Sequence, residues 1–412
     1  MAARSSMLVV AITFLLAAPP AFSERRRFRA TMTRTEPAIN LTRAAHKSHE
    51  RLSMLAARLD AASGTAQTPL QLDSGGGAYD MTFSIGTPPQ QLSALADTGS
   101  DLIWAKCGAC TRCVPQGSPS YYPNKSSSFS KLPCSSGLCR TLQSKSLPTC
   151  SGGGAGGAEC DYKYSYGLAS DPHHYTQGYL GSETFTLGSD AVAGIGFGCT
   201  NMSEGGYGSG SGLVGLGSGP LSLVSQLKVG AFSYCLTSDA AKTSPLLFGS
   251  GALTGAGVQS TPLLQTSTYY SVNLKSISIG AATTPGTGSS GIIFDSGTTL
   301  TYLAEPAYTL AKAAVLSQTT NLTRVPGTDG YEVCFQTSGA VFPSMVLHFD
   351  GGDMDLPTKN YFRPVDDTVS CWIVQKSPSL SIVGNIMQMN YHIRYDVEKS
   401  MLSFQPANCD SF

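Results

Sequence analysis

Two four-residue motifs, one in each half of the chain, constrain its possible folds more than any other feature. Residues 97–100 read Asp-Thr-Gly-Ser and residues 295–298 read Asp-Ser-Gly-Thr. Apolar runs, residues 92–96 and 291–294, precede the motifs, and apolar residues resume after each. A strand that carries a carboxylate into an apolar setting costs free energy unless the carboxylate is paired or used. Two such motifs therefore predict two similar halves that bring two carboxylates together.

The residue types in these motifs suit acid–base chemistry. A single copy could be a solvated turn with a capping Asp, but two copies in matching contexts favour a functional pair. Two carboxylates within hydrogen-bonding distance do not both ionise cheaply, so one keeps a proton while the other is charged. The charged one can accept a proton from water, and the protonated one can polarise a carbonyl oxygen. Asp97 and Asp295 are the predicted catalytic pair, with no metal or cofactor required.

The remaining motif residues are predicted to support this pair. Glycine lets backbone amides approach the carboxylates, and hydroxyl groups can hydrogen-bond the outer carboxylate oxygens and fix their orientation. The supporting residues are Thr98, Gly99, Ser100, Ser296, Gly297 and Thr298.

Composition predicts an all-β architecture. Only 13% of the 412 residues are charged and 45 are glycine, and short alternating runs such as residues 270–274 recur between turn residues. A chain of this length can bury a large core and hold two lobes. Beyond the N-terminal segment, a long helical pattern is absent, apart from short candidates at Leu221–Leu227 and Glu305–Leu316. Nothing resembles a nucleotide-binding loop, a zinc framework or a basic nucleic-acid face, so we expect no nucleic-acid partner.

The N-terminus has the features of a secretory signal peptide over residues 1–23. Arg4 precedes an apolar stretch over residues 7–18, and small residues at Ala21 and Ser23 suit a signal-peptidase site. The apolar stretch is too short for a membrane span, and no other run reaches about 18 apolar residues. The C-terminus carries neither an apolar tail nor a retention signal. We therefore expect a soluble protein of the secretory pathway with no membrane anchor.

Residues 24–75 form a predicted basic propeptide. Residues 24–63 contain nine Lys or Arg against four Asp or Glu, while the rest of the chain is net acidic. Leu52 and Leu55 fall at helical spacing behind a possible cap at Asn40. A basic helix beside an acidic body is expected to be held by charge and loosened by acid. The alternative is a disordered basic tail, since charge runs are often solvated.

Further markers make the chain resemble the pepsin-like aspartic proteases, most closely the nepenthesin-like group of plants. The resemblance extends from about residue 78 to residue 409. Residues 213–217 (Leu-Val-Gly-Leu-Gly) resemble the segment that passes beside the first catalytic loop, and residues 382–385 (Ile-Val-Gly-Asn) resemble its counterpart in the second half. Thr98 and Ser296 occupy the positions whose hydroxyls cross-link the two loops in this family.

The resemblance implies a bilobal fold with the active-site cleft between an N-terminal lobe, residues 76–240, and a C-terminal lobe, residues 241–412. It implies a monomeric aspartic endopeptidase, made as a zymogen with its own propeptide, that hydrolyses proteins or peptides at acidic pH. The expected destination is the extracellular space (apoplast) or the vacuole. The alternative is a catalytically weak binding protein or inhibitor of a cell-wall-degrading enzyme, since such relatives share the fold. Both motifs are intact here, which favours the enzyme.

The predicted flap starts at Tyr166 and Gly167, with Trp104 as the expected hydrogen-bond partner of Tyr166. The family usually reads Tyr-Gly-Asp-Gly-Ser here, whereas this chain reads Tyr-Gly-Leu-Ala-Ser and continues for several more residues before Gly178. Because the flap closes over substrate, the altered sequence is expected to change subsite preferences without preventing closure. The two histidines at residues 173–174 are expected to be solvated.

Twelve cysteines in a secreted chain predict six disulfides. The cluster Cys107-x-x-Cys110-x-x-Cys113 could be taken for a metal site, but no His or fourth Cys follows at matching spacing. This region resembles the cysteine-rich insertion of the family's N-terminal lobe, and the sequence alone leaves the connectivity open. The family resemblance implies the pairs Cys107–Cys110, Cys113–Cys199, Cys134–Cys160, Cys139–Cys150, Cys235–Cys409 and Cys334–Cys371. Glycans are expected at the sequons Asn124, Asn201 and Asn321.

Overall fold

The computed structural model describes residues 27–34, 39–60, 77–143, 149–151, 158–165, 174–205, 210–249, 253, 257–265, 269–328 and 330–411. The predicted signal peptide, the last part of the predicted propeptide and the flap residues Tyr166 and Gly167 lie outside these ranges.

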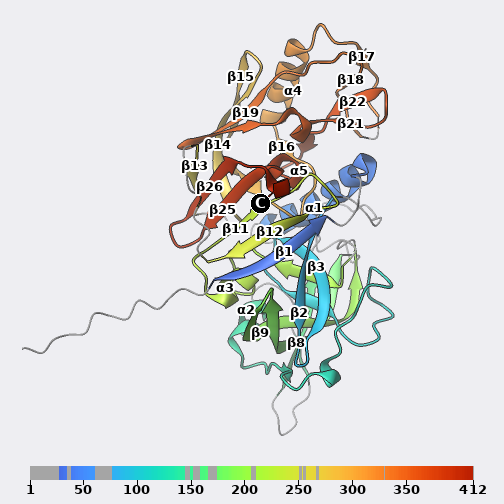
Figure 1. Ribbon diagram of the computed structural model, residues 1–412, viewed down its shortest axis with the longest axis vertical. Helices are drawn as coiled ribbons and strands as arrows, with labels where there is room; N and C mark the ends of the chain where they lie inside the picture. The colour runs from blue at the N-terminus through green and yellow to red at the C-terminus, as the bar shows by residue number, and fades with distance from the viewer. Residues whose placement is uncertain are drawn as a thin grey trace, which may run out of the picture.

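Two β-rich lobes make up the molecule (Figure 1). The first half of the chain, cyan to green, forms the lower lobe in this view, and most of the second half, orange to red, forms the upper one. Within the described residues, the strands form a 15-stranded, a seven-stranded and a four-stranded sheet. This confirms the predicted all-β, bilobal class.

The largest sheet contains β1 (Phe28–Arg34), β2 (Tyr79–Ile85), β3 (Gln90–Asp97), β4 (Trp104–Lys106), β5 (Ser130–Lys131), β6 (Thr149–Ser151), β7 (Glu159–Ser165), β8 (Tyr175–Leu187), β9 (Asp190–Glu204), β10 (Gly212–Gly215), β11 (Ala231–Cys235), β12 (Thr243–Phe248), β13 (Gln259–Pro262), β25 (Tyr391–Asp396) and β26 (Met401–Pro406). The seven-stranded sheet contains β14 (Ser271–Ile279), β15 (Ala282–Phe294), β16 (Tyr302–Ala304), β19 (Met345–Phe349), β20 (Gly352–Leu356), β23 (Gln375–Ser377) and β24 (Ile382–Val383). The smallest contains β17 (Arg324–Val325), β18 (Cys334–Gln336), β21 (Phe362–Pro364) and β22 (Val369–Trp372).

The helices pack around these sheets. The α-helices are α1 (Leu41–Asp60), α2 (Gly137–Gln143), α3 (Leu223–Leu227), α4 (Ala307–Gln318) and α5 (Asn385–Gln388). In the part of the chain that the structure describes, the short 3₁₀ turns are η1 (Pro123–Lys125), η2 (Thr358–Asn360) and η3 (Cys409–Ser411).

Alternating burial explains the long strands of the lower lobe. Along β8, side chains alternate between buried and partly exposed for most of its length, as expected for a strand with one face on a core. Phe83 of β2 and Phe185 of β8 stack with ring centroids 5.3 Å apart. Burying one such side chain contributes about 1.5–3 kcal/mol. This packing holds β2 and its neighbour β3, whose end carries Asp97.

Strands from both halves of the chain meet in the middle of the largest sheet. β11 pairs with β25, and β12 pairs with β1, which also pairs with β2. Figure 1 shows β1, in blue, crossing the centre of the molecule. Its residues Phe28, Ala30 and Met32 are buried. Part of the predicted propeptide is therefore an interior strand, contrary to the alternative of a disordered basic tail.

The long N-terminal helix begins where the sequence predicted. Asn40 Oδ1 accepts a 3.0 Å hydrogen bond from the backbone N–H three residues later, so Asn40 caps α1. Leu52 and Leu55 are buried, which confirms the predicted apolar face. The two shorter predicted helices are α3 and α4. They begin slightly later than expected because Ser222 and Pro306 occupy their N-cap positions.

The disulfide pairing differs from the family expectation in the N-terminal lobe. Cys235–Cys409 and Cys334–Cys371 are present as expected. The other four expected pairs are absent, and the structure instead has Cys107–Cys199, Cys110–Cys113, Cys134–Cys150 and Cys139–Cys160.

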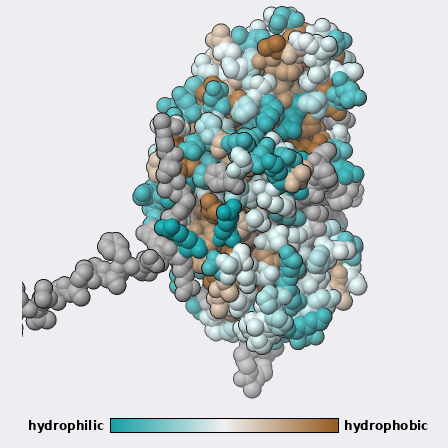
Figure 2. Space-filling model, viewed as in Figure 1, coloured by the Kyte–Doolittle hydropathy of each residue, from teal (hydrophilic) through white to brown (hydrophobic). Residues whose placement is uncertain are grey.

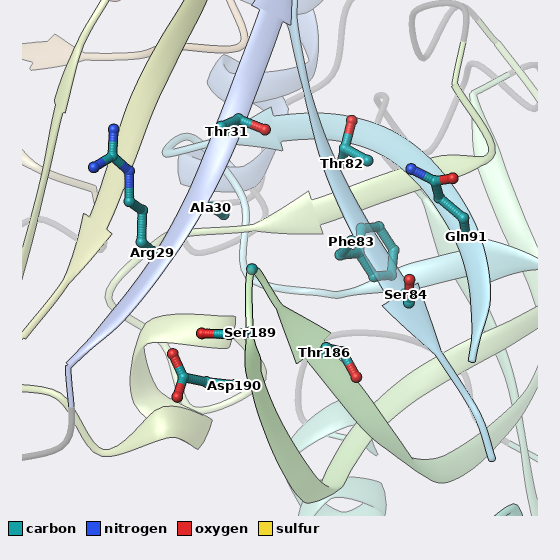
Figure 3. Close-up of a pocket in the computed structure, with 11 residues that line it drawn as sticks. Arg29, Ala30, Thr31, Thr82, Phe83, Ser84, Gln91, Thr186, Ser189 and Asp190 are labelled. Atoms are coloured by element: carbon teal, nitrogen blue, oxygen red, sulfur yellow. The ribbon is translucent and has the colours of Figure 1, made fainter. Parts of the chain in front are cut away.

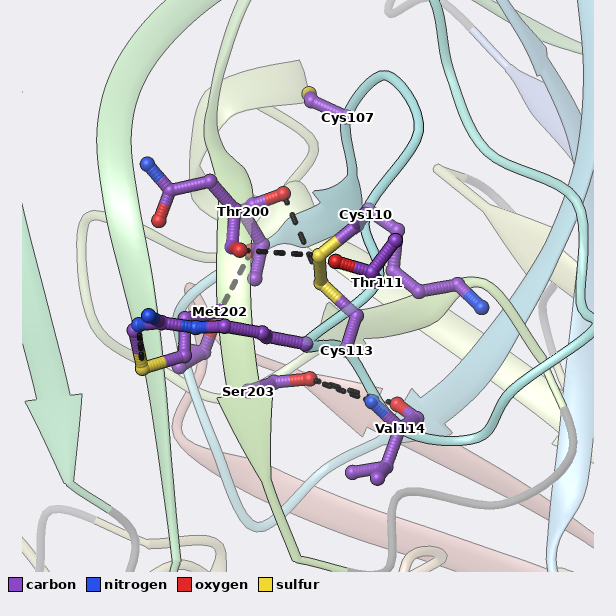
Figure 4. Close-up of a disulfide and its surroundings, with 12 residues drawn as sticks. Cys107, Cys110, Thr111, Cys113, Val114, Thr200, Met202 and Ser203 are labelled. Atoms are coloured by element: carbon purple, nitrogen blue, oxygen red, sulfur yellow. Dashed lines mark hydrogen bonds between the residues drawn. A yellow bond between two sulfur atoms is a disulfide. The ribbon is translucent and has the colours of Figure 1, made fainter.

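Strand register and a turn explain two of these pairs, Cys107–Cys199 and Cys110–Cys113. β4 runs parallel to β9 with Ala105 opposite Cys199, which brings Cys107 to a Cα distance of 5.4 Å from Cys199. The turn after β4 brings the Cα atoms of Cys110 and Cys113 within 5.5 Å of each other. Figure 4 shows the Cys110–Cys113 bond beside Thr200 of β9, whose carbonyl lies 3.9 Å from Cys113 Sγ. Both Cα–Cα distances, 5.4 Å and 5.5 Å, lie in the range usual for disulfides.

The surface is mixed in polarity. Figure 2 shows teal polar residues over both lobes, with apolar surface in small separate patches on this face. Among the described residues, the large apolar side chains that are exposed are Leu310 and Val341. No helix in the described ranges is both long and apolar enough to cross a membrane.

Candidate active site

The two predicted motifs lie in equivalent loops at the ends of strands. β3 ends at Asp97 and lies parallel to β10, with Gly215 opposite Asp97. β15 ends just before Asp295 and lies parallel to β24. Gly384, which follows β24, has no room for a side chain, because a Cβ would collide with the Leu300 carbonyl. The two glycine segments noted in the sequence therefore lie beside the catalytic loops.

Reciprocal hydrogen bonds join the two loops. The Thr98 N–H donates to Ser296 Oγ at 3.1 Å, and the Ser296 N–H donates to Thr98 Oγ1 at 2.9 Å. Each hydroxyl also donates to the opposite strand, Thr98 to the Phe294 carbonyl at 3.0 Å and Ser296 to the Ala96 carbonyl at 2.8 Å. All four partners are buried, so these bonds face no competition from water.

The motif residues orient the two carboxylates. The Gly99 N–H donates to Asp97 Oδ1 at 2.9 Å, and the Gly297 N–H donates to Asp295 Oδ1 at 2.8 Å. The outer oxygens accept hydrogen bonds from the Ser100 and Thr298 hydroxyls. Both aspartates are fully buried. A Cβ on Gly99 would lie 2.9 Å from Asp295 Oδ1, so the glycine allows the loops to approach.

Arg51 of α1 lies between the two carboxylates, a contact that the sequence did not reveal. Its Nη2 contacts Asp97 Oδ1, and its Nε donates to Asp295 Oδ2 at 2.9 Å. A further bond from Nε to Thr298 Oγ1 measures 3.1 Å. Planar guanidinium groups suit two carboxylates because their donors form a rigid fork. The only sequence signal was a basic residue next to the buried face marked by Leu52 and Leu55.

Other groups of the C-terminal lobe hold α1 along its length. Tyrosine hydroxyls donate to three α1 backbone carbonyls: Tyr331 to Leu41 at 2.8 Å, Tyr302 to Ala45 at 3.3 Å and Tyr269 to Leu55 at 3.2 Å. The Leu300 N–H donates to Ser48 Oγ at 2.9 Å. The helix is therefore docked by specific polar contacts as well as by charge.

Arg51 changes the acidity of the site. Burial alone would raise the pKa of Asp295, because a charged carboxylate loses its hydration. The Arg51 charge and hydrogen bond, followed by bonds from Thr298 and the Gly297 N–H, instead hold this pKa below its ordinary value. Asp295 is therefore held as a charged carboxylate while α1 is docked.

The structure describes most of the remaining predicted site residues, but not Tyr166 and Gly167 of the predicted flap. Trp104 is buried in β4, while its expected partner Tyr166 lies outside the described residues. Asn124, Asn201 and Asn321 are exposed. His174, directly before β8, was expected to be solvated but is only 3% exposed, and the other histidine of the pair, residue 173, lies outside the described residues. Within the described ranges, no cluster of three His, Cys, Asp or Glu residues could bind a metal ion.

A separate cavity of about 350 Å³ lies between β1, β2 and the β8–β9 turn. Figure 3 shows hydroxyl groups from Thr31, Thr82 and Ser84 around it, with Asp190 on the turn. Among the described residues that line it, Asp190 is the one carboxylate, so they do not provide the acid–base pair found at the loop ends.

Comparisons with known proteins agree with this geometry. Two family models match, described as Xylanase inhibitor N-terminal over residues 79–250 and Xylanase inhibitor C-terminal over residues 269–406. Aspartic proteinase nepenthesin-1 of Nepenthes gracilis is 40% identical, with 98% of each chain covered. Nepenthesin-2 of the same plant is 39% identical, with 90% of this chain and 86% of that protein covered.

Among solved structures, basic 7S globulin from soybean superposes with a TM-score of 0.66 and 16% identity, covering 93% of this chain and 97% of the other. At that identity, the likeness shows a shared fold alone.

Two β lobes that hold buried carboxylates on cross-linked loops define an aspartic-type protease architecture. The chain belongs to the pepsin-like aspartic protease family, in its nepenthesin-like plant group. It is an aspartic proteinase and thus a hydrolase, which confirms the enzyme class predicted from the sequence.

Proposed function

We propose that the protein is a secreted aspartic endopeptidase, made as a zymogen, in which Asp97 and Asp295 activate the water that attacks a peptide bond. The observation that carries this proposal is the contact of one guanidinium, that of Arg51, with both buried carboxylates. A group that touches both at once marks a position from which a water could also reach both.

Departure of α1 would leave the carboxylates free to share one proton. The charged carboxylate then takes a proton from the water, and the protonated one donates to the carbonyl oxygen of the substrate. Bonds from Gly99, Ser100, Gly297 and Thr298 keep the acceptor oxygens oriented, so little reorganisation is needed during the reaction. No covalent intermediate forms on the protein.

In the zymogen, Arg51 occupies this position, and α1 blocks access for a substrate. Acid favours release, since protonation of Asp295 removes its attraction for the Arg51 guanidinium. The proposed substrates are proteins and peptides, and the proposed form is a glycosylated monomer that acts in the extracellular space or the vacuole at acidic pH.

The direct test is digestion of a denatured protein at acidic pH by the wild type, Asp97→Asn and Asp295→Asn. An amide is nearly isosteric but cannot share the proton, so each variant should lose roughly 10²–10⁴-fold in rate. A statine-type transition-state analogue should inhibit the wild type. Asp353→Asn, at a side chain that is 64% exposed, is the matched control and should keep full activity. Equal rates in all four proteins would exclude the dyad.

A second candidate is a protein that binds and inhibits a cell-wall-degrading enzyme. The two matching family models, which are those of a xylanase inhibitor, favour it. The closely similar full-length proteinases and the complete hydrogen bonding of both carboxylates favour the enzyme. The second candidate would be established if the activated protein inhibited the hydrolysis of xylan by a xylanase and digested no denatured protein at any acidic pH.

A further inference from the structure

A group of buried polar side chains lies behind the two catalytic loops. Its members are Tyr234 of β11, Tyr270 just before β14, Tyr395 of β25 and Gln388 of α5, which we call the tyrosine cluster. Tyr234, Tyr395 and Gln388 are fully buried, and Tyr270 is 2% exposed. The rings of Tyr270 and Tyr395 lie 4.6 Å apart. Burying four such groups is costly unless each one is hydrogen-bonded.

The hydrogen bonds in the cluster form a directed chain that ends beside Asp295. The Tyr234 hydroxyl donates to Gln388 Oε1, and this leaves it as the acceptor for the Tyr395 hydroxyl at 2.6 Å. Gln388 Nε2 donates to the Val383 carbonyl at 2.7 Å. That same carbonyl accepts the backbone N–H of Asp295 at 3.2 Å. The chain therefore runs from β25 and β11 through α5 and β24 to the backbone of one catalytic residue.

Tyr270 reaches the other catalytic residue in a similar way. Its hydroxyl donates to the Leu216 carbonyl at 3.0 Å. The N–H of Leu216 donates to the Asp97 carbonyl at 2.8 Å. The ring contact between Tyr270 and Tyr395 then links this path to the first one. One buried cluster is thus connected to the backbone of both aspartates.

We propose that the tyrosine cluster positions the two catalytic loops and so sets the relative placement of Asp97 and Asp295. This inference rests on the proposed protease function. Small displacements of reacting groups cost large factors in rate, so a fixed backbone behind each carboxylate matters for catalysis. The cluster acts through Val383 and Leu216 and touches neither substrate nor the reacting atoms.

The protonation of the tyrosines agrees with this role. Burial raises the pKa of Tyr234 and of Tyr395, and the charge of Asp295 raises both further. Burial also raises the pKa of Tyr270. The hydroxyls therefore remain donors over the whole working range of the enzyme, and the direction of the chain does not change with pH.

The test compares Tyr234→Phe and Gln388→Met with the control Tyr391→Phe. Tyr391 is another buried tyrosine, and its hydroxyl donates to the Asp355 carbonyl, away from both loops. We expect Tyr234→Phe to lower kcat about tenfold, by analogy with the cost of small misplacements, with KM within twofold. The affinity for a statine-type analogue should fall by a similar factor. The double variant should be no worse than the poorer single variant, because both changes break one chain. Tyr391→Phe should lower the Tm but keep kcat.

A second measurement does not depend on activity. Hydrogen exchange of the Thr98 and Ser296 amides, which cross-link the loops, should be faster in Tyr234→Phe than in the wild type and unchanged in Tyr391→Phe. If the wild type is inactive but exchange is still faster in Tyr234→Phe than in the wild type, the positioning role is supported and the protease function is rejected. An active wild type with equal kcat and equal exchange in Tyr234→Phe and Tyr391→Phe would overturn the positioning role alone.

Discussion

Arg51 forms a buried ion pair with Asp295, 244 residues further along the chain, with Nε donating to Oδ2 at 2.9 Å. The same guanidinium contacts Asp97, so one side chain of α1 binds both carboxylates that the proposed reaction needs. Removal of one partner from a buried ion pair costs about 3–5 kcal/mol, because the other charge is left uncompensated.

Arg51→Met should therefore release α1 from the cleft. We expect faster autoactivation of the full chain, by at least about tenfold, since 1.4 kcal/mol already corresponds to a factor of ten. The measurement is the rate at which proteolytic activity appears after purification near neutral pH. Arg43→Met, at an exposed position on the same helix, is the control and should leave this rate unchanged. Equal activation of Arg51→Met and wild type would contradict the blocking role.

Release of α1 should depend on pH in a defined window. In the docked form, the pKa of Asp295 lies below its ordinary value of about 4. A carboxylate with a depressed pKa stabilises the docked form above its ordinary pKa, and this stabilisation is lost as pH falls through the depressed value. Activation of the wild type should accelerate as pH drops below about 4. A rate that is constant from pH 6 to pH 3 would be the contrary result.

Tyr331→Phe should weaken the docking of α1 without affecting the mature enzyme. The lost bond to the Leu41 carbonyl is worth about 0.5–1.5 kcal/mol. The expected result is a lower Tm of the full chain and an unchanged Tm of the activated protein. Tyr361→Phe removes a comparable bond to the Pro343 carbonyl within the C-terminal lobe, so it should lower the Tm of the full chain and the Tm of the activated protein alike. A Tm shift of equal size in both forms of Tyr331→Phe would show that this hydroxyl has no specific role in docking.

His392 should limit stability at acidic pH. Burial, with a smaller effect of the Arg394 charge, lowers the pKa of this histidine to about 4. The unfolded chain binds a proton near pH 6.5 and the folded chain only near pH 4, so stability is lost as pH falls between these values. The Tm of His392→Gln relative to wild type should rise as pH falls through this window. His348→Gln, at a less buried histidine, should show no such gain. A constant Tm difference from pH 7 to pH 4 would argue against the effect.

The cysteine pairing can be read directly by mass spectrometry of non-reduced peptides. We expect the cross-linked peptides Cys107–Cys199 and Cys110–Cys113, and neither Cys107–Cys110 nor Cys113–Cys199. Cys235–Cys409 serves as the internal control, because both the family resemblance and the structure have it. Detection of Cys113–Cys199 as the major species would restore the family pairing.

Local features of the sequence were sufficient for the fold class and the protein family. The Asp-Thr-Gly-Ser and Asp-Ser-Gly-Thr motifs carry their own requirement for a buried, glycine-lined turn after an apolar strand, and the alternating runs require sheets. The Asn40 cap and the apolar spacing of Leu52 and Leu55 likewise depend on neighbours within one helix, so α1 could be predicted.

Two other long-range contacts, that of Arg51 with the aspartates and that of Cys107 with Cys199, were decided by the tertiary structure alone. Many basic residues precede the first motif, and only the docking of α1 against the C-terminal lobe selects Arg51 for the space between Asp97 and Asp295. The pairing of Cys107 with Cys199 depends on the register of β4 against β9, which no local pattern encodes. Long-range contacts of this kind are set by packing and strand register over the whole fold, and sequence spacing does not specify them.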